Sequence, residues 1–272
     1  SFIIPARNEQ NLIGKVIESI ICNFPSMFCY EIILVDNLSS DKTMEIAQSY
    51  NVTVIYSNAN TVASLRNHGA GIATGNIFIF IDADVLIKKK WGENIYKVLR
   101  NVYTNPLLLT GSWYGLSDSP SWLERSWFGP LTQGSKTHIN SGHLIISKYL
   151  FQKLNGFDPD LITGEDYDFS QRAIALGATI DDNAGLEVSH EGYPKNIKDF
   201  IKREVWHGKG DFKRFGFFIK SKVALLSVSL IFLHLLILIN MFLKNYIVVS
   251  ICIFMILFLF IFSSFVKYTS AV

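Results

Sequence analysis

Hydrophobic positions in the first part of the chain alternate between short continuous runs and repeats at helical spacing. A continuous apolar run predicts a strand covered on both faces, as in a parallel sheet. Repeats at three- and four-residue spacing predict helices that bury one face. The predicted strands are Phe2–Pro5, Glu31–Val35, Val52–Tyr56 and Ile77–Ile81. The predicted helices between them cover Leu12–Ile21, Ser39–Tyr50 and Val62–Ala73. This alternation predicts a doubly wound, mostly parallel α/β sheet.

The pattern is less regular after residue 87. We expect a helix over Trp91–Val102, preceded by a solvated turn at 88–90. The further predicted elements are strands at Leu107–Thr110, Asn140–Ser147 and Ala178–Val188 and a helix from Glu165 to about Leu176. The dense aromatic residues between positions 113 and 128 favour core or membrane-facing positions over a ligand platform.

Two apolar runs of 21 residues each, Val223–Leu243 and Tyr246–Val266, end the chain and are separated only by Lys244 and Asn245. A helix that crosses a bilayer needs about 20 apolar residues. The pattern therefore predicts a transmembrane hairpin over residues 223–272.

Charge divides the chain where the apolar region begins. Residues 1–194 carry 14 basic and 20 acidic side chains, and residues 195–272 carry 11 basic and 3 acidic ones. Basic residues concentrate before the first apolar run, so the positive-inside rule predicts a multi-pass protein of the cell membrane with its globular domain, residues 1–194, in the cytoplasm. Aromatic residues among the bases, Phe212 to Phe218, predict that 195–222 is an interfacial helix on membrane lipid. Adjacency to a membrane span argues against nucleic acid as the partner of these bases.

Cys22, Cys29 and Cys252 have neither metal-ligand spacing nor an even disulfide framework, as is typical of a reducing compartment. The sequence begins at Ser1 inside a predicted strand, without Met or a signal peptide, and we expect a few residues to precede it.

Asp82 and Asp84 follow the most apolar predicted strand, Ile77–Ile81. Ligands bind at the carboxyl ends of the strands in open α/β sheets, because the loops diverge there. Two carboxylates two residues apart can point the same way, and their hard oxygens suit Mg²⁺ or Mn²⁺ shared with a diphosphate. The alternative is a solvated acidic loop.

Polar side chains also follow the first two strands. Arg7 and Glu9 come after the first, and Asp36 ends the second. A row of carboxylates along one sheet edge suits a base, a ribose and a metal-bound diphosphate. The first strand is not followed by Gly-X-Gly-X-X-Gly, so the usual dinucleotide-binding unit is excluded.

Glu165 and Asp166 open a predicted helix. Acidic residues in a first turn are commonly only complements of the helix dipole. The functional alternative is a carboxylate that acts as a general base on an attacking hydroxyl.

The ordered set Pro5–Glu9, Asp36, the helix end at Ala70–Gly75, Asp82-Ala83-Asp84 and Glu165-Asp166 resembles family 2 of the inverting glycosyltransferases, which have the GT-A fold. The resemblance covers about residues 1–215. It implies that a nucleotide-diphosphate sugar is the donor and that a saccharide or a lipid-linked molecule is the acceptor.

The resemblance also implies roles for single residues. Asp36 would contact the base or ribose, Arg66 would approach the phosphates, and Asp82 and Asp84 would hold Mn²⁺ or Mg²⁺. Asp166 would be the general base. The other implied site residues are the neighbour of the base, Glu165, and the substrate contacts Pro5, Arg7, Glu9, Gly142 and Trp206. His190 corresponds to a histidine that in some relatives completes the metal site or contacts the diphosphate, and a strand-capping role is the alternative.

Two departures from the family pattern matter. Asn37 stands where many relatives have a second acid, which leaves base preference open. Processive members carry Gln-X-X-Arg-Trp before the membrane, whereas here Trp206 is present and the arginine, Arg203, is displaced. With two visible spans, the sequence therefore predicts transfer of a single sugar and not export of a polymer. The rival functions are a sugar nucleotidyltransferase and a non-catalytic, nucleotide-binding membrane scaffold.

Overall fold

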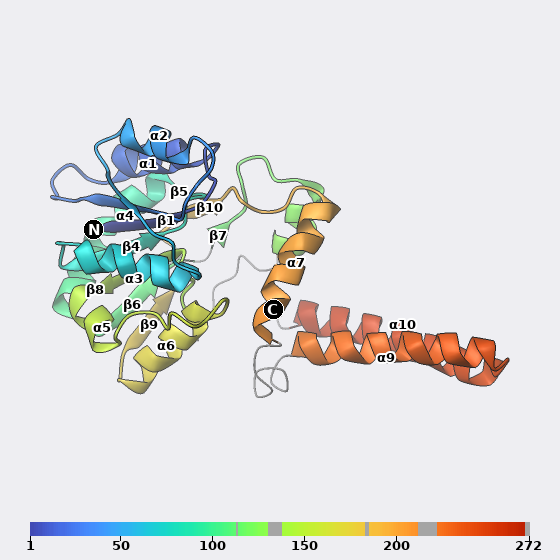
Figure 1. Cartoon of the computed structure of the whole chain (residues 1–272). Coiled ribbons are helices and arrows are strands. Elements are labelled where there is room, and N and C mark those ends of the chain that lie inside the picture. The colour runs from blue at the N-terminus through green and yellow to red at the C-terminus, as the bar shows by residue number, and fades with distance from the viewer. Residues whose placement is uncertain (113, 130–137, 183–184, 212–221, 270–272) are drawn as a thin grey trace. The chain divides into compact units, whose positions relative to one another are not determined.

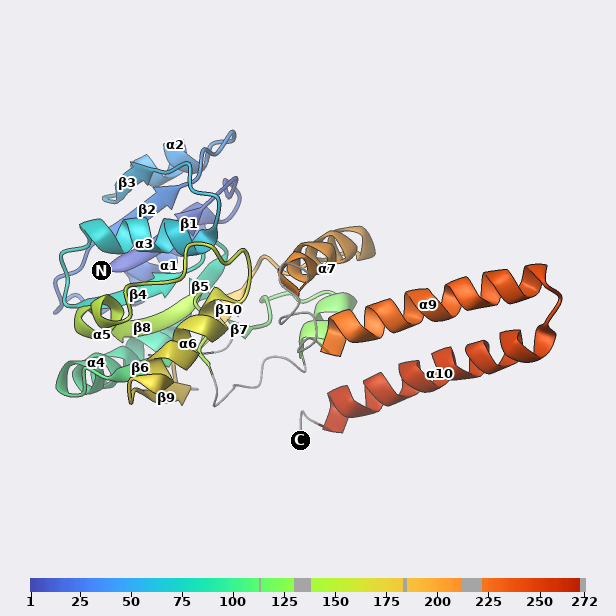
Figure 2. The ribbon, with the colours of Figure 1, turned by 60° about the horizontal axis from the view of Figure 1, so that its bottom comes forward.

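The computed structural model describes all residues except 113, 130–137, 183–184, 212–221 and 270–272. The chain divides into two compact units, Ser1–Ile197 and Lys198–Val272. Figures 1 and 2 show the ribbon from two sides. The prediction that the interfacial segment includes Phe212 to Phe218 lies outside the described residues.

The first unit is built on a seven-stranded sheet in the order β3-β2-β1-β4-β8-β6-β9. Its first half is parallel: β1 (Phe2–Ala6) lies between β2 (Ile32–Asp36) and β4 (Ile77–Ile81), and β3 (Thr53–Tyr56) pairs with β2. Every residue of β1 and β2 is buried. The continuous apolar runs therefore correspond to central strands, as predicted.

In the second half of the sheet one strand, β8, runs in the opposite direction to the others. β8 (His143–Ser147) is antiparallel to both β4 and β6 (Leu108–Gly111), and β6 is parallel to β9 (Thr179–Asp182). The sheet is mostly parallel, as predicted, with β8 as the exception. Because β8 runs against β4, its first residues lie beside the end of β4, where Asp82 follows.

A second, three-stranded sheet lies at that edge. β10 (Val188–His190) pairs antiparallel with β5 (Val85–Ile87) and parallel with β7 (Tyr114–Gly115). The single strand predicted over Ala178–Val188 is therefore wrong, since this segment contributes to two different sheets. The small sheet brings β10 beside the segment that carries Asp84.

Helices cover both faces of the large sheet (Figure 1). Contacts and burial place α1 (Ile13–Asn23) and α4 (Lys89–Thr104) on one face, and α3 (Val62–Ile72), α5 (Lys148–Lys153) and α6 (Glu165–Ala175) on the other. The short α2 (Thr43–Gln48) contacts α1 and β3. The predicted doubly wound arrangement is confirmed, although the turn expected at 88–90 is partly the first turn of α4.

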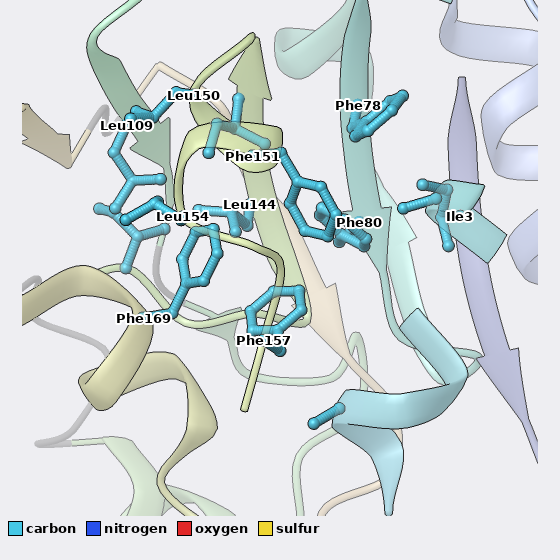
Figure 3. Packing of buried hydrophobic residues seen from close by; sticks show 14 of the residues in the cluster. Ile3, Phe78, Phe80, Leu109, Leu144, Leu150, Phe151, Leu154, Phe157 and Phe169 are labelled. Carbon is cyan, nitrogen blue, oxygen red and sulfur yellow. The ribbon is translucent and has the colours of Figure 1, made fainter. Parts of the chain in front are cut away.

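Aromatic side chains fill the core on the face covered by α3, α5 and α6 (Figure 3). Phe157 and Phe169 lie with ring centroids 4.4 Å apart, and Phe80 meets Phe157 edge to face at 5.3 Å. Burying one such side chain contributes about 1.5–3 kcal/mol. This packing fixes α6, and with it the acidic residues of its first turn, against β4.

The second unit contains α7 (Ile197–Asp211), which begins at the last residue of the first unit, together with α9 (Lys222–Phe242) and α10 (Tyr246–Thr269). The helices α9 and α10 contact each other side by side (Figures 1 and 2). Within the described residues, one helix is long and apolar enough to span a bilayer, through Leu225–Phe242 with a mean hydropathy of 2.4. A shorter apolar stretch follows at Tyr246–Leu259, so the two-span hairpin stays a prediction.

Candidate active site

Asp82 and Asp84 lie directly after β4, in the turn that leads into β5. The backbone N–H of Asp82 donates to the carbonyl of Gly142 at 3.0 Å, and that of Val85 donates to the carbonyl of Asp82 at 3.1 Å. The antiparallel β8 is the element that brings Gly142 here. Both carboxylates therefore stand on a backbone tied to two sheets.

Arg66 of α3 joins the two acidic motifs. Its Nη2 lies 2.5 Å from Asp82 Oδ1, and its Nη1 lies 2.8 Å from Glu165 Oε1. The arginine is 2% exposed, and Ser141 Oγ also donates to Glu165 Oε1 at 2.9 Å. Burial alone would lower the pKa of Arg66, but Asp82 and Glu165 raise it above its ordinary value. A guanidinium suits this position, because its planar fork can meet two carboxylates at once.

Tyr114 of β7 occupies the other side of Asp82. Its hydroxyl lies 3.0 Å from Asp82 Oδ2 and 2.8 Å from Asn140 Oδ1, and donates its single proton to one of them at a time. Burial, followed by the charges of Asp82 and Asp84, raises the pKa of Tyr114 well above its ordinary value. The phenol therefore stays protonated and acts as a hydrogen-bond donor.

Gly142 makes this arrangement possible. A Cβ added there would lie 1.7 Å from the Tyr114 hydroxyl and 2.1 Å from Asp82 Oδ2. Real Cβ contacts are never this short, so any side chain at this position would displace the carboxylate. Gly142, predicted as a substrate contact, lies directly against Asp82 in the structure.

Asp84 meets the end of β10. Its Oδ2 lies 3.4 Å from His190 Nε2, and its carbonyl accepts from the N–H of Glu191 at 2.8 Å. A Cβ on Gly192 would lie 1.8 Å from Asp84 Oδ2. The structure thus brings together Asp84 and His190, which are far apart in the sequence.

These side chains fit a divalent ion. Among the described residues, no group of three or more His, Cys, Asp and Glu side chains could hold a metal alone. The oxygen of Asp84 and the nitrogen of His190 are 3.4 Å apart and would hold a divalent ion together with ligands from water and substrate phosphates, which Mg²⁺ and Mn²⁺ commonly take. Asp82 keeps lone pairs beyond those used by Arg66 and Tyr114.

Asp36 ends β2 as a fully buried carboxylate. Its Oδ2 accepts from the N–H of Ser39 at 2.9 Å, whereas its Oδ1 is buried without a hydrogen-bond partner among the described residues. An unpaired buried acceptor costs about 1–3 kcal/mol. A buried oxygen without a partner is expected in a carboxylate that accepts a hydrogen bond from a ligand.

The loop after β1 is tied to the loop after β2. Asn8 Oδ1 accepts from the N–H of Ser40 at 2.8 Å, and the N–H of Glu9 donates to Thr43 Oγ1 at 2.7 Å. Burial, and then the charges of Asp84, Asp41 and Asp82, raise the pKa of Glu9 to about 7. The negative charges of the two aspartates after β4 therefore act on the Glu9 carboxyl.

Asp166 stands in the first turn of α6, beside Glu165. The N–H of Tyr167 donates to its Oδ1 at 2.7 Å. Burial, and then the charge of Glu165, raise the pKa of Asp166 to about 6. A carboxyl that titrates near neutral pH suits a general base.

Three predicted site residues remain, Pro5, Arg7 and Trp206. Pro5 is buried within β1, paired in register with Val35, and Arg7 is exposed after it. Trp206 is 44% exposed in α7 of the second unit, and its role as a substrate contact stays a prediction.

Sequence reasoning missed Tyr114, Asn140, Ser141 and Gly192. Tyr114 lies in a two-residue strand, and Ser141 and Asn140 precede β8 in an otherwise ordinary polar turn. The one available signal was Gly192, which directly follows His190-Glu191 in the sequence.

Comparison with known proteins gives consistent matches. Residues 1–149, more than half of the chain, match the model of Glycosyl transferase family 2, and residues 139–263 match that of Glycosyl transferase family group 2. A dolichyl N-acetyl-alpha-D-glucosaminyl phosphate 3-beta-D-2,3-diacetamido-2,3-dideoxy-beta-D-glucuronosyltransferase of Methanococcus voltae is 24% identical over 241 residues, which cover 80% of this chain and 75% of that relative. A poly(ribitol-phosphate) beta-glucosyltransferase of Bacillus spizizenii is 33% identical over 91 residues, which are 31% of this chain and 14% of that enzyme.

Several solved structures share the fold of this chain, among them those of a mannosyltransferase and of TarS. The mannosyltransferase PcManGT from Pyrobaculum calidifontis, in complex with GDP-Man and Mn²⁺, has a TM-score of 0.59 at 16% identity, covering 78% of this chain and 62% of that one. TarS of S. aureus, in complex with UDP, has a TM-score of 0.52 at 17% identity, covering 79% of this chain and 65% of that one. At such identities these likenesses show the fold alone.

Proposed function

Because this chain belongs to glycosyl transferase family 2, we propose that it transfers one sugar, with inversion and with a divalent metal, from a nucleotide-diphosphate sugar to an acceptor hydroxyl or phosphate. The observation that carries the proposal is the double ion pair of Arg66 with Asp82 and Glu165. It joins the Asp-X-Asp turn to the first turn of α6, so that a metal-binding motif and a candidate base serve one site.

Asp36 is the proposed contact for the nucleoside. Its unpartnered Oδ1 can accept a hydrogen bond from a base N–H or a ribose hydroxyl. Pro5, Arg7 and Glu9 would line the same pocket from the end of β1. The complexes of TarS with UDP and of PcManGT with GDP-Man support a nucleoside diphosphate at such a site, and the base preference of this chain stays open.

Asp82, Asp84 and His190 are the proposed holders of Mn²⁺ or Mg²⁺, which would neutralise the charge that develops on the leaving diphosphate. Arg66, in contrast, has both terminal nitrogens committed to carboxylates. We therefore assign it the role of orienting Asp82 and Glu165, in place of the phosphate contact that the family resemblance implies.

Asp166 is the proposed general base. It would take the proton of the acceptor hydroxyl as the oxygen forms its bond to the anomeric carbon and the bond from that carbon to the diphosphate oxygen breaks on the opposite side. A single displacement of this kind inverts the anomeric centre. The pKa of Asp166, about 6, is still below neutral pH, so the carboxylate is mostly ionised there, and its raised value makes it a stronger base than an ordinary aspartate.

The second unit supports a membrane location. Ile197, Ile201 and Val205 are more than half exposed and recur every four residues along α7, which places them on one face of the helix. Lys198 and Lys202 adjoin this stripe, and the bilayer-length helix α9 follows. An apolar stripe beside basic residues suits an anionic lipid surface. We propose a multi-pass protein of the cell membrane, with the first unit in the cytoplasm and Trp206 near the substrate.

The name of the Methanococcus voltae relative, a dolichyl-phosphate glycosyltransferase, favours a lipid-linked acceptor for this chain. A water-soluble saccharide is the other acceptor class. Equal transfer to a soluble saccharide and to any polyprenyl-linked acceptor would remove the preference for lipid.

The test is the release of nucleoside diphosphate from UDP-, GDP- and dTDP-sugars by the detergent-purified full chain, with membrane lipid extract as the acceptor. Release from one donor, dependent on Mn²⁺ or Mg²⁺ and lost with EDTA and in Asp84→Ala, is expected. Asp118→Ala is the matched control, since the side chain of Asp118 is 75% exposed and pairs with Lys88 at 2.6 Å. Donor binding without any release would instead indicate a non-catalytic scaffold.

A further inference from the structure

We propose that Tyr193 is a positioning residue of the metal site, whose ring holds the His190 imidazole in place beside Asp84. The inference rests on the proposed function, because it concerns the ion that Asp84 and His190 would share. Tyr193 touches neither metal nor substrate in this proposal and acts only through His190.

Four rings contact one another in succession next to the two aspartates, since Tyr114 bonds Asp82 and His190 meets Asp84. The centroids of Tyr114 and His190 are 4.7 Å apart, those of His190 and Tyr193 are 4.2 Å apart, and those of Tyr193 and Phe128 are 4.3 Å apart. The interplanar angle of the last pair is 20°, which is a stacked geometry. The imidazole of His190 therefore packs against two aromatic rings, those of Tyr114 and Tyr193.

His190 depends on this packing for its orientation. A metal-binding histidine usually has its second nitrogen fixed by a hydrogen bond to a carboxylate, a carbonyl or water, which sets the ring. Here the second nitrogen, Nδ1, is buried without a hydrogen-bond partner among the described residues. The neighbouring rings, and Tyr193 above all, supply the constraint that the missing hydrogen bond would give.

The backbone that precedes Tyr193 is held against Asp84. The N–H of Glu191 is bonded to the carbonyl of Asp84, and Gly192 lies against the Asp84 carboxylate. Tyr193 follows at once and is 8% exposed. His190, Glu191 and Gly192 thus each meet Asp84, and Tyr193, which directly follows them, packs its ring against His190.

Tyr193 in turn has a rigid support. Phe128, 1% exposed, ends the π-helix η1 (Glu124–Phe128). The fully buried Glu124 anchors this element by accepting from Ser117 Oγ at 2.7 Å and from the N–H of Ser121 at 2.6 Å. Phe128 therefore opposes movement of the Tyr193 ring away from His190.

The experiment measures Mn²⁺ binding directly, by electron paramagnetic resonance titration of the detergent-purified full chain without donor. Tyr193→Leu, which keeps apolar volume but removes the ring, is expected to weaken Mn²⁺ binding about 10-fold, the lower end of the effect of losing a group that orients a metal ligand. Tyr193→Phe is expected to bind Mn²⁺ within about 2-fold of the wild type. Tyr96→Leu is the matched control, because Tyr96 stacks on Phe28 at 5.9 Å in another part of the first unit.

A role in core packing alone would lower the thermal midpoint of Tyr193→Leu without changing its Mn²⁺ affinity, and that result would overturn the proposal. If Tyr193→Leu does not fold, Phe128→Leu serves as the second variant, because it removes the ring that supports Tyr193. It should weaken Mn²⁺ binding about 3-fold, which is less than the loss expected when the Tyr193 ring itself is removed. Unchanged affinity in that variant would also overturn the proposal. A wild type that binds no Mn²⁺ but still releases nucleotide would refute the metal site and Tyr193 with it, yet leave the transferase intact.

Discussion

Replacement of Asp166 by Asn should make the protein more stable and nearly inactive at the same time. The pKa of Asp166 is about 6 in the folded chain, because of burial and then the charge of Glu165, against an ordinary value of 3.8. Between about pH 4 and pH 6 the folded chain keeps a proton that the unfolded chain has released. The stabilising contribution of the protonated form is therefore complete below about pH 4 and is lost as the pH rises through 6.

The magnitude follows from the difference of about two pKa units at about 1.4 kcal/mol each. Above pH 6 the ionised Asp166 should lower the free energy of unfolding by about 2–3 kcal/mol. Asp166→Asn removes this cost, so its thermal midpoint at pH 8 should be about 5–10 °C above that of the wild type. The difference in thermal midpoint between Asp166→Asn and the wild type should vanish as the pH approaches 4.

The assay follows thermal unfolding of the detergent-purified full chain from pH 4 to pH 8, together with nucleotide release. Turnover by Asp166→Asn should fall about 10²–10⁴-fold with donor affinity nearly unchanged, and wild-type turnover should fall below about pH 6. Asp168→Asn is the control, because Asp168 is paired with Arg172 at 2.8 Å and its loss should stabilise the protein at no pH. A gap in thermal midpoint that does not depend on pH, or wild-type turnover by Asp166→Asn, would refute the reasoning.

Two further substitutions test the contacts around Asp82. Arg66→Met leaves two carboxylates without their cation and should lower the free energy of unfolding by about 3 kcal/mol, with loss of turnover; a thermal midpoint equal to that of the wild type would contradict the role of Arg66. Gly142→Ala should displace Asp82 and lower turnover at least about 10-fold. Gly71→Ala is the control for Gly142→Ala, since a Cβ at Gly71 in α3 meets open space and should be tolerated. Equal turnover of the two variants would disprove the close approach at Gly142.

Three strands in the first half of the sheet, β1, β2 and β4, were predictable from sequence because they are buried on both faces and appear as unbroken apolar runs, whereas the edge strand β3 is partly exposed. The direction of β8 was not, since an apolar run looks the same in a parallel and an antiparallel strand. The small sheet escaped prediction because β5, β7 and β10 have two or three residues each, too few for any periodicity.

The candidate site was predictable to a similar extent. Asp82 and Asp84 could be placed at the sheet edge because a strong strand precedes them. Pairings over long separations could not, such as that of Arg66 with Glu165, which are 99 residues apart. A sequence pattern reports local periodicity, and these contacts depend on how α3, β4 and α6 pack.

The order of strands along the chain has a consequence for biosynthesis. Four of the six strands that share one direction, β1 to β4, come from residues 2–81. Glu165, which shares Arg66 with Asp82, and His190, which meets Asp84, are translated much later. Proteins fold from the N-terminal side as they emerge from the ribosome. The first half of the sheet can therefore form on the nascent chain, while the ionic and aromatic contacts that complete the candidate site assemble only shortly before the apolar helices leave the ribosome.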